Sequence, residues 1–468
     1  MPLGLISSEQ QDDYWSQNTR RKIFYSYPNG TAPLTGFLSL ADDAEETPIP
    51  QFGWNEERWE RRQTTTTAGP TSNVTFYTTG TTTSAGATFT PTAGTNYRMY
   101  VTDASEFQVD DMLKVHGLVI NSGGAKTEIS FRVTATNTSG TDYVEGTVVA
   151  SAPGAITNNS STSGVNQGNY VVRMGSAFAE GARSRTGSRK YPSEILNNTQ
   201  IFKDAIELTR TALKEPLKYD KSGDYKNQLK KVGIEHMAGI EWAFLFGDRG
   251  SETATDEDTG DTVSRRMTGG LLWFLKQWEK GSVANGGAFN YRSSAVDVSA
   301  ETDYQTYRNK RIIRLAGNTV TKSQFGAIEA LPFQKTNSTE WCKLCLAGQG
   351  YLSKVNEFYE KQVQVTQLRG EAYKGWDFQL YERASLAGKI YYKNHPLFND
   401  DLMYNSAFYI DLGYIKYRPL TDSDTDVQQM IQANDADKRK DQYLTECGLE
   451  LPFPEAHMYV ENLGGITL

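Results

Sequence analysis

The sequence is poor in cysteine, in net positive charge and in long apolar runs. Three cysteines, Cys342, Cys345 and Cys447, are too few for a disulfide framework in 468 residues, which favours synthesis in a reducing cytosol. A net charge of −8 argues against a tight nucleic-acid binder, because phosphate neutralisation supplies most of the affinity of such proteins. No stretch approaches the ~18 apolar residues of a membrane span, and the first residues lack the pattern of a signal peptide.

Motifs for catalysis and metal binding are also scarce. Cys342-Lys343-Leu344-Cys345 is a CxxC pair, but no second cysteine pair is present to complete a zinc site, so we interpret these residues as core thiols. Glu235 and His236 fall in a predicted helix, yet a zincin needs two histidines on that helix. Walker, GxSxG and dinucleotide-binding fingerprints are absent. We therefore expect no catalytic residue, no cofactor and no metal.

Aromatic residues are abundant, at 12% of the chain, and many lie in residues 1–62. This segment shows neither a helical nor a strand period, and Pro28, Pro33, Pro48 and Pro50 interrupt it. Because it cannot easily bury its aromatic side chains in a core of its own, we expect an arm that lies along its own subunit or a neighbour. The alternative is a strand tucked into the same domain. The candidate inter-subunit contacts are Trp15, Phe24, Phe52, Trp54 and Trp59.

Two charge clusters could pair between subunits. The densest basic run holds Arg183, Arg185, Arg189 and Lys190, and its complement in the arm is Asp42, Asp43, Glu45 and Glu46. We favour a charged strand that meets an acidic neighbour. Nucleic-acid binding and plain solvent exposure are the alternatives.

Residues 63 to about 172 have a different composition, rich in Thr and Gly. Alternating segments such as Tyr97–Val101 and Tyr143–Val149 are bounded by turn-forming residues. This pattern predicts a small antiparallel β module, which we expect to be an insertion that projects from the main body.

From Asn197 onward the pattern is interpreted as helical. A helix is predicted from Asp224 to Phe246, with an apolar stripe and Gly247 at its C-terminal cap; 23 residues at 1.5 Å each give a rod of roughly 35 Å. A shorter helix follows Thr268, and Ser251–Val263 between the two helices is interpreted as an acidic, Thr-rich loop.

Residues from about 290 to 420 alternate between helix and strand signals and predict an α+β unit. A helix is expected around Tyr351–Tyr359, and Gln442–Val460 resembles an extended, hairpin-like return. The expected strands are Lys361–Leu368, Gly388–Lys393 and Ala407–Tyr417.

The order of these parts resembles that of the major capsid proteins of tailed bacteriophages with the Hong Kong 97-like fold. Local stretches that carry the resemblance are Phe52–Glu56, Phe107–Asp111, Asn198–Phe202, Leu245–Gly247 with Glu241, Met267–Leu271 and Glu455–His457. Each match is weak alone, and their order along nearly the whole chain is the specific feature.

The resemblance implies an α+β capsid fold of five parts. These are an N-terminal arm (1–62), an extended (E) loop (63–194) with a β-rich insertion at about 70–172, a peripheral (P) domain (195–289) with a spine helix at 224–246, an axial (A) domain (290–420) and a C-terminal return to the P domain (421–468). The long helical scaffolding segment of some relatives is missing at the N-terminus, so a separate scaffold is expected, or an arm that takes over part of that work. No motif here supports covalent cross-linking.

The resemblance also implies a function and partners. The chain would assemble with itself into the hexamers and pentamers of an icosahedral shell, made in the bacterial host cytoplasm and located in the virion capsid. Portal, scaffolding and cement or decoration proteins would be its partners, double-stranded DNA would be enclosed rather than specifically bound, and no membrane would be involved. The alternatives are a tail-tube, fibre or adhesin-like protein and, less favoured, a cytosolic CxxC redox enzyme.

Overall fold

The computed structural model describes residues 32–462, with several gaps, and divides the chain into two compact units. Unit 1 comprises Met1–Glu56 and Ser193–Leu468, and unit 2 comprises Glu57–Pro192. The ranges not described are 1–31, 42–43, 58–62, 70–74, 80–87, 106, 121–124, 151, 153, 158–167, 185–191, 215–223, 256–258, 281–295, 298–310, 316–319, 335–341, 360–380, 386–387, 400–402 and 463–468. Within the described ranges, no helix has the length and apolar character that crossing a membrane would require.

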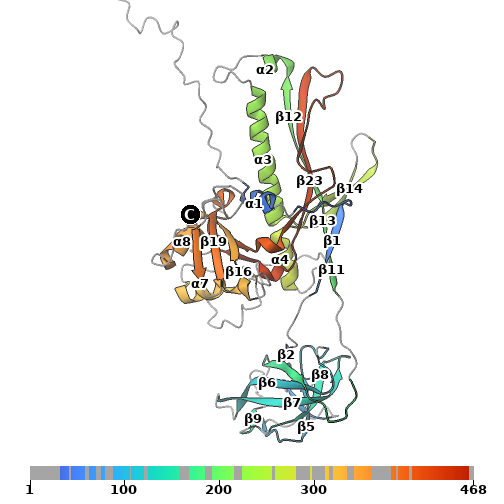
Figure 1. The fold of residues 1–468 in the computed structure, drawn as a ribbon, viewed down its shortest axis with the longest axis vertical. Coiled ribbons are helices and arrows are strands. Elements are labelled where there is room, and N and C mark those ends of the chain that lie inside the picture. The colour runs from blue at the N-terminus through green and yellow to red at the C-terminus, as the bar shows by residue number, and fades with distance from the viewer. Residues whose placement is uncertain are drawn as a thin grey trace, which may run out of the picture. The chain divides into compact units, whose positions relative to one another are not determined.

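Unit 1 mixes helices with several sheets (Figure 1). Its helices are α1 (Pro33–Ala41), α2 (Arg210–Lys214), α3 (Asp224–Phe246), α4 (Leu271–Lys280), α7 (Lys322–Glu329) and α8 (Gln349–Tyr359), with 3₁₀ turns η2 (Leu331–Phe333), η3 (Pro396–Asn399), η4 (Leu412–Tyr414) and η5 (Pro454–Ala456). The predicted α+β class is thus confirmed. The long helix expected from Asp224 to Phe246 is present as α3, and it lies along a sheet of long strands.

The described strands of unit 1 form four sheets. Strand β1 (Gln51–Glu56) pairs with β11 (Ser193–Asn198), and β13 (Gly250–Thr255) forms a hairpin with β14 (Thr262–Met267). A four-stranded sheet holds β12 (Gln200–Thr209), β23 (Lys438–Glu450), β21 (Lys416–Pro419) and β22 (Asp426–Gln428). A seven-stranded sheet has the order β15 (Val296–Asp297), β16 (Ile312–Arg314), β24 (Met458–Glu461), β20 (Ala407–Ile410), β17 (Cys342–Ala347), β19 (Gly388–Asn394) and β18 (Tyr381–Ser385).

The two faces of the seven-stranded sheet belong to two different cores. Along β17, Leu344 and Leu346 pack into the cluster that contains α3 and α4 residues, whereas Cys345 and Ala347 pack into the cluster of α7 and α8. Successive strand residues point to opposite faces, so the run of apolar residues in β17 fills both cores at once.

Four sequence predictions for unit 1 are wrong in detail. Residues 197–209, expected to be helical, form the end of β11 and β12, in which exposed side chains alternate with partly buried or buried ones. The expected loop Ser251–Val263 contains most of the β13–β14 hairpin. The strand expected at Ala407–Tyr417 is interrupted by η4, and the expected C-terminal return does not stay together: β23 pairs with β12, whereas β24 joins the seven-stranded sheet. The strand expected at Lys361–Leu368 lies outside the described residues.

Unit 2 contains the predicted antiparallel β module. Its described residues form nine strands: β2 (Gln63–Thr65), β3 (Phe76–Thr78), β4 (Thr88–Phe89), β5 (Asn96–Tyr100), β6 (Asp111–Ile120), β7 (Ala125–Asn137), β8 (Tyr143–Val148), β9 (Ile156–Thr157) and β10 (Tyr170–Ser176). The main order is β2-β10-β6-β7-β8-β5-β3, with β9 paired to β4 and β6. Apolar residues such as Leu113, Phe131 and Val144 alternate toward a core that unit 2 makes by itself. The assignment of P, A and E domains stays a prediction.

Candidate functional site

The first described part of the arm is a helix, and a buried carboxylate holds it in place. Glu241 on α3 is fully buried and accepts hydrogen bonds from the backbone N–H groups of Leu34 and Thr35, both at 2.8 Å, and from the Thr35 hydroxyl at 2.6 Å. The first N–H groups of a helix lack partners within the helix and carry a partial positive charge. Glu241 therefore caps α1 from another element and fixes where the arm joins unit 1.

A fourth contact completes the environment of Glu241. His395, which is also fully buried, lies with Nε2 at 3.0 Å from Glu241 Oε1. Leu34 and Leu38 of α1 are buried in the same core as α3 and α4. The arm is thus held by apolar packing and by a hydrogen-bonded carboxylate together.

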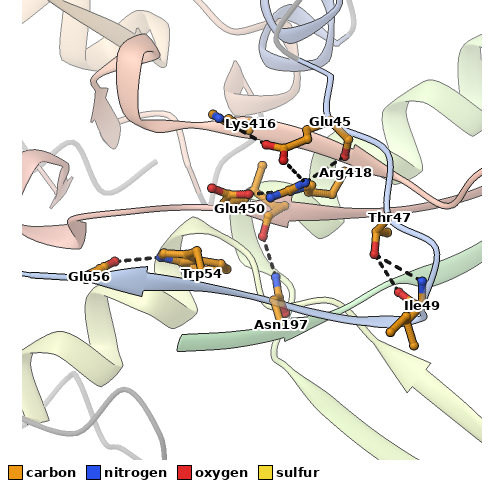
Figure 2. A network of polar contacts seen from close by, with 10 residues as sticks. Glu45, Thr47, Ile49, Trp54, Glu56, Asn197, Lys416, Arg418 and Glu450 are labelled. Atoms are coloured by element: carbon orange, nitrogen blue, oxygen red, sulfur yellow. Dashed lines mark hydrogen bonds and ion pairs between the residues drawn. The ribbon is translucent and has the colours of Figure 1, made fainter. Parts of the chain in front are cut away.

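The segment after α1 continues along the edge of β21. Thr47 N–H donates to the Pro419 carbonyl at 2.9 Å, Thr421 N–H donates back to the Thr47 carbonyl at 3.0 Å, and Thr47 bridges to Leu420 in parallel. Figure 2 shows this segment passing over β21 and turning into β1. An extended segment thereby gains register from backbone pairing at a sheet edge.

Glu45 joins this edge through charge (Figure 2). Its carboxylate lies 3.1 Å from Arg418 and 3.4 Å from Lys416, and Arg418 also binds Glu450 at 2.5 Å. Slight burial opposes ionisation of Glu45, but Arg418 and Lys416 outweigh it and lower the pKa of this carboxyl below its usual value. Glu45 belongs to the acidic cluster that we predicted to meet the basic run near Arg183. In this structure it pairs instead with Arg418 and Lys416 of its own chain.

Strand β1 carries two of the candidate contacts, Phe52 and Trp54, and it buries both. They retain 7% and 9% exposure, and they pack in the core of α3 and α4. The indole N–H of Trp54 donates to Glu56 at 2.9 Å, and Glu56 also accepts the Phe453 N–H at 3.0 Å. Alternating burial along β1 explains this result, since every second side chain faces the core. Proposing Phe52 and Trp54 as inter-subunit contacts was wrong, because they have almost no free surface.

Of the other candidate contacts apart from Glu45, two are exposed and the rest lie outside the described residues. Arg183 is exposed in unit 2, and Glu46 is exposed in unit 1. The remaining candidates lie outside the described residues: Trp15, Phe24, Asp42, Asp43, Trp59, Arg185, Arg189 and Lys190. Their inter-subunit role stays a prediction.

Asn197 ties the end of β11 to two distant segments. Its side-chain nitrogen donates to the Leu449 carbonyl at 2.7 Å and the Gly269 carbonyl at 3.1 Å, and its oxygen accepts the Gly269 N–H at 2.8 Å. The side chain is fully buried. It therefore satisfies backbone groups that no water can reach.

We expect Asn197→Leu to lower the free energy of unfolding by about 2–4 kcal/mol, because several buried backbone groups lose their partner. Asn197→Asp keeps an acceptor for Gly269 N–H but replaces the donor with a charge that faces two carbonyls, and it should also be destabilising. Urea unfolding of the purified chain measures both values. An Asn197→Asp variant as stable as the parent protein would contradict this account.

A second buried polar cluster, which the sequence did not predict, lies between β17 and η5. Lys343 and Asp411 are 2% exposed or less and form an ion pair of 2.6 Å, while Asp411 N–H donates to His457 Nδ1 at 3.2 Å. Burial lowers the pKa of His457 to about 3, and Lys343 adds to the shift while Asp411 opposes it. The histidine is therefore neutral in the folded chain at ordinary pH.

This cluster predicts acid sensitivity. An unfolded histidine takes up a proton near pH 6.5, whereas folded His457 resists protonation down to about pH 3, so acid favours the unfolded state. The stability due to neutral His457 is fully present above pH 6.5 and decreases as pH falls toward 3. At 1.36 kcal/mol per pH unit, lowering the pH from 6.5 to 4.5 should reduce the free energy of unfolding by about 2–3 kcal/mol through this histidine. The His457→Gln variant should not show this part of the loss. Parallel stability curves for the two proteins would contradict this prediction.

The cysteine pair shows no sign of a redox site. Cys342 and Cys345 lie on strand β17, Cys345 is fully buried, and burial raises the pKa of its thiol well above the usual value. A thiolate is the reactive form, so these conditions suppress reactivity. Within the described residues, no group of three or more His, Cys, Asp or Glu side chains could hold a metal ion.

The anchoring residues were not identified as such from the sequence. Glu241 was noted only for its place in a motif, and nothing linked it to Leu34 or His395, which lie more than 150 positions away. A buried position for an acidic residue on the apolar stripe of a long helix is a usable signal, because a buried carboxylate requires partners.

Comparison with known proteins identifies one matching family. A family model described as "SU10 major capsid protein" matches residues 10–464. No protein in the curated set matches the chain.

Three solved structures illustrate the structural likeness. A chain from Mycobacterium phage Bobi has a TM-score of 0.42 at 7% identity, covering 98% of this chain and 99% of its own. The holo-SrpI encapsulin complex of Synechococcus elongatus PCC 7942 gives 0.35 at 8% identity, covering 59% of this chain and 77% of that one. A satellite phage P4 procapsid gives 0.33 at 11% identity, covering 62% and 78%. These likenesses are too distant to support an assignment by themselves, whereas the family model spans nearly the whole sequence.

Proposed function

The chain belongs to the SU10 major capsid protein family, and from this premise we propose that it assembles into hexamers and pentamers of an icosahedral shell that encloses phage double-stranded DNA. Its role is structural, in a phage capsid. The match over residues 10–464 is the observation that carries the proposal. The mixed helix and strand architecture is consistent with the Hong Kong 97-like fold expected from the sequence.

The surface of unit 1 supports contacts between copies. Ile49, Ile201 and Met430 are 60%, 53% and 66% exposed, so each can contribute apolar area to a contact with another copy. Apolar residues that remain exposed on a single chain often become buried in a partner interface. The β13–β14 hairpin is a further candidate for a contact between copies. A two-stranded sheet alone is only marginally stable in water, and packing against another copy would stabilise it.

The proposed partners follow from the same role. The shell is built from copies of this chain, with a portal, a scaffolding protein and cement or decoration proteins as further partners. A net charge of −8 suits a container that encloses DNA without binding it tightly. We place the mature protein in the virion capsid and its synthesis in the bacterial host cytoplasm. No described residue cluster favours an enzymatic role.

Electron microscopy tests the proposal directly. The chain is expressed alone and together with its genomic neighbours, and the products are imaged. We expect closed shells or hexameric capsomers. A small, discrete monomer under all of these conditions would contradict the proposed function.

A further inference from the structure

Unit 2 contains a pocket of about 530 Å³ between two loops and strand β7. Its floor includes the buried Phe107, and its mouth exposes Val109 and Phe178, which are 49% and 43% exposed. The lining is mixed: Phe107, Val109 and Phe178 supply apolar surface, and Gln108, Asp110 and Arg183 supply polar groups. Clefts of several hundred Å³ that combine apolar surface with a few polar groups are typical binding sites.

The loops that form the pocket are held in place by hydrogen bonds. Gln108 N–H donates to the Asp111 carboxylate at 3.0 Å, and Asp111 N–H donates to the Gln108 carbonyl at 3.1 Å. On the other side, Ala177 N–H donates to the Asp110 carbonyl at 3.0 Å. The pocket is therefore formed before any ligand arrives, which reduces the entropy lost on binding.

Polar groups at the pocket define the chemistry of its ligand. The side-chain oxygen of Gln108 is buried and has no hydrogen-bond partner among the described residues. Arg183 is exposed and forms no ion pair within the described residues, whereas Asp110 lies 3.4 Å from Arg132, so its charge is balanced. A fitting ligand has an aromatic body, a hydrogen-bond donor and a carboxylate beside it.

We infer that the pocket binds the segment Asp12-Asp13-Tyr14-Trp15 from the arm of another copy of this chain, an inference that rests on the proposed function. In residues 1–31, which lie outside the described residues, the aromatic residues fall in two groups. Tyr14 and Trp15 follow two aspartates, whereas Phe24 and Tyr25 follow Arg20-Arg21-Lys22, which Arg183 would repel. Only the first group has the required charge.

Each part of this segment has a partner in the pocket. The Trp15 ring contacts Val109 and Phe178, its indole N–H donates to Gln108, and the aspartates pair with Arg183. Tryptophan and arginine are the residue types most enriched at binding hot spots. Glu45 is engaged by Lys416 and Arg418, so it does not compete with the aspartates for Arg183.

The length of the arm permits this contact between copies. Seventeen Cα-to-Cα steps lead from Trp15 to Ala32, the first described residue, and at about 3.3 Å each they can span roughly 55 Å when extended. That distance exceeds the length of α3, so the chain before Ala32 is long enough to extend well beyond the helix that anchors the arm.

Photo-crosslinking in the full-length chain tests the inference. Trp15 is replaced by benzoylphenylalanine, ¹⁵N-labelled and unlabelled chains are co-assembled, and cross-linked peptides are identified by mass spectrometry. We expect cross-links between labelled and unlabelled copies in peptides that contain Val109 or Phe178. Cross-links only elsewhere, or only within one copy, would overturn the inference.

Charge reversal gives an independent measurement. Arg183→Glu should reduce the cross-link yield about tenfold, and adding Asp12→Lys with Asp13→Lys should restore it. Arg314→Glu, at an exposed arginine of unit 1 in β16, is the matched control and should leave the yield unchanged. If the particles assemble and Arg183→Glu leaves the cross-link yield unchanged, this inference alone is refuted. If the parent chain never assembles, the proposed function is refuted.

Discussion

Glu241→Ala is expected to lower the free energy of unfolding by about 3–5 kcal/mol and to detach α1 from unit 1. The carboxylate receives three hydrogen bonds from Leu34 and Thr35 and lies against His395. Glu241, Leu34 and His395 are fully buried. Removing it leaves the first turn of α1 without a partner, and the helix can regain hydration only by giving up the packing of Leu34 and Leu38.

Two measurements and one control make this prediction specific. Chemical denaturation gives the change in free energy, and hydrogen exchange of residues 33–41 reports whether α1 has detached. Glu235→Ala is the matched control, because Glu235 lies on the exposed side of the same helix. It should change neither quantity appreciably. Unchanged exchange in α1 after Glu241→Ala would show that apolar packing alone holds the arm.

The sequence predicted those elements whose pattern is local and strong. The helix Asp224–Phe246 is long enough for its apolar stripe to be unambiguous, and the β module of unit 2 alternates over several segments. The β13–β14 hairpin was missed because its residues are mostly polar, so no apolar period marked the strands. Its register depends on backbone pairing, which composition does not reveal.

The anchors of the arm could not be predicted because they are long-range. Thr47 pairs with a strand about 370 positions away, and Glu241 joins α1 to His395, which follows β19. A single sequence contains no record of which distant segments meet. The sequence does show which side chains require burial. Phe52 and Trp54 were recognised as such side chains, and the structure shows that they are buried within their own chain.

Deletion of unit 2 should abolish assembly but leave unit 1 folded. We expect the chain to retain the fold of unit 1 when Glu57–Pro192 is removed and Glu56 is joined to Ser193 through Asn-Gly, and we expect it to lose the ability to assemble. Glu56 and Ser193 are the last antiparallel pair of β1 and β11, so a two-residue turn can close the ends without moving either strand. Among the described residues, each hydrophobic cluster draws its members from a single unit, so the cut exposes no shared core.

The two halves of this prediction are measured separately. Circular dichroism and a single cooperative unfolding transition report the fold of the shortened chain, and residues 57–192 expressed alone should show their own β-sheet signal. Electron microscopy then reports assembly. Because the proposed docking pocket for the arm lies wholly in unit 2, its loss removes a contact between copies while sparing the anchors at Glu241 and Glu45. Normal shells from the shortened chain would show that unit 1 alone carries assembly, and an unfolded product would show that unit 1 depends on unit 2 for stability.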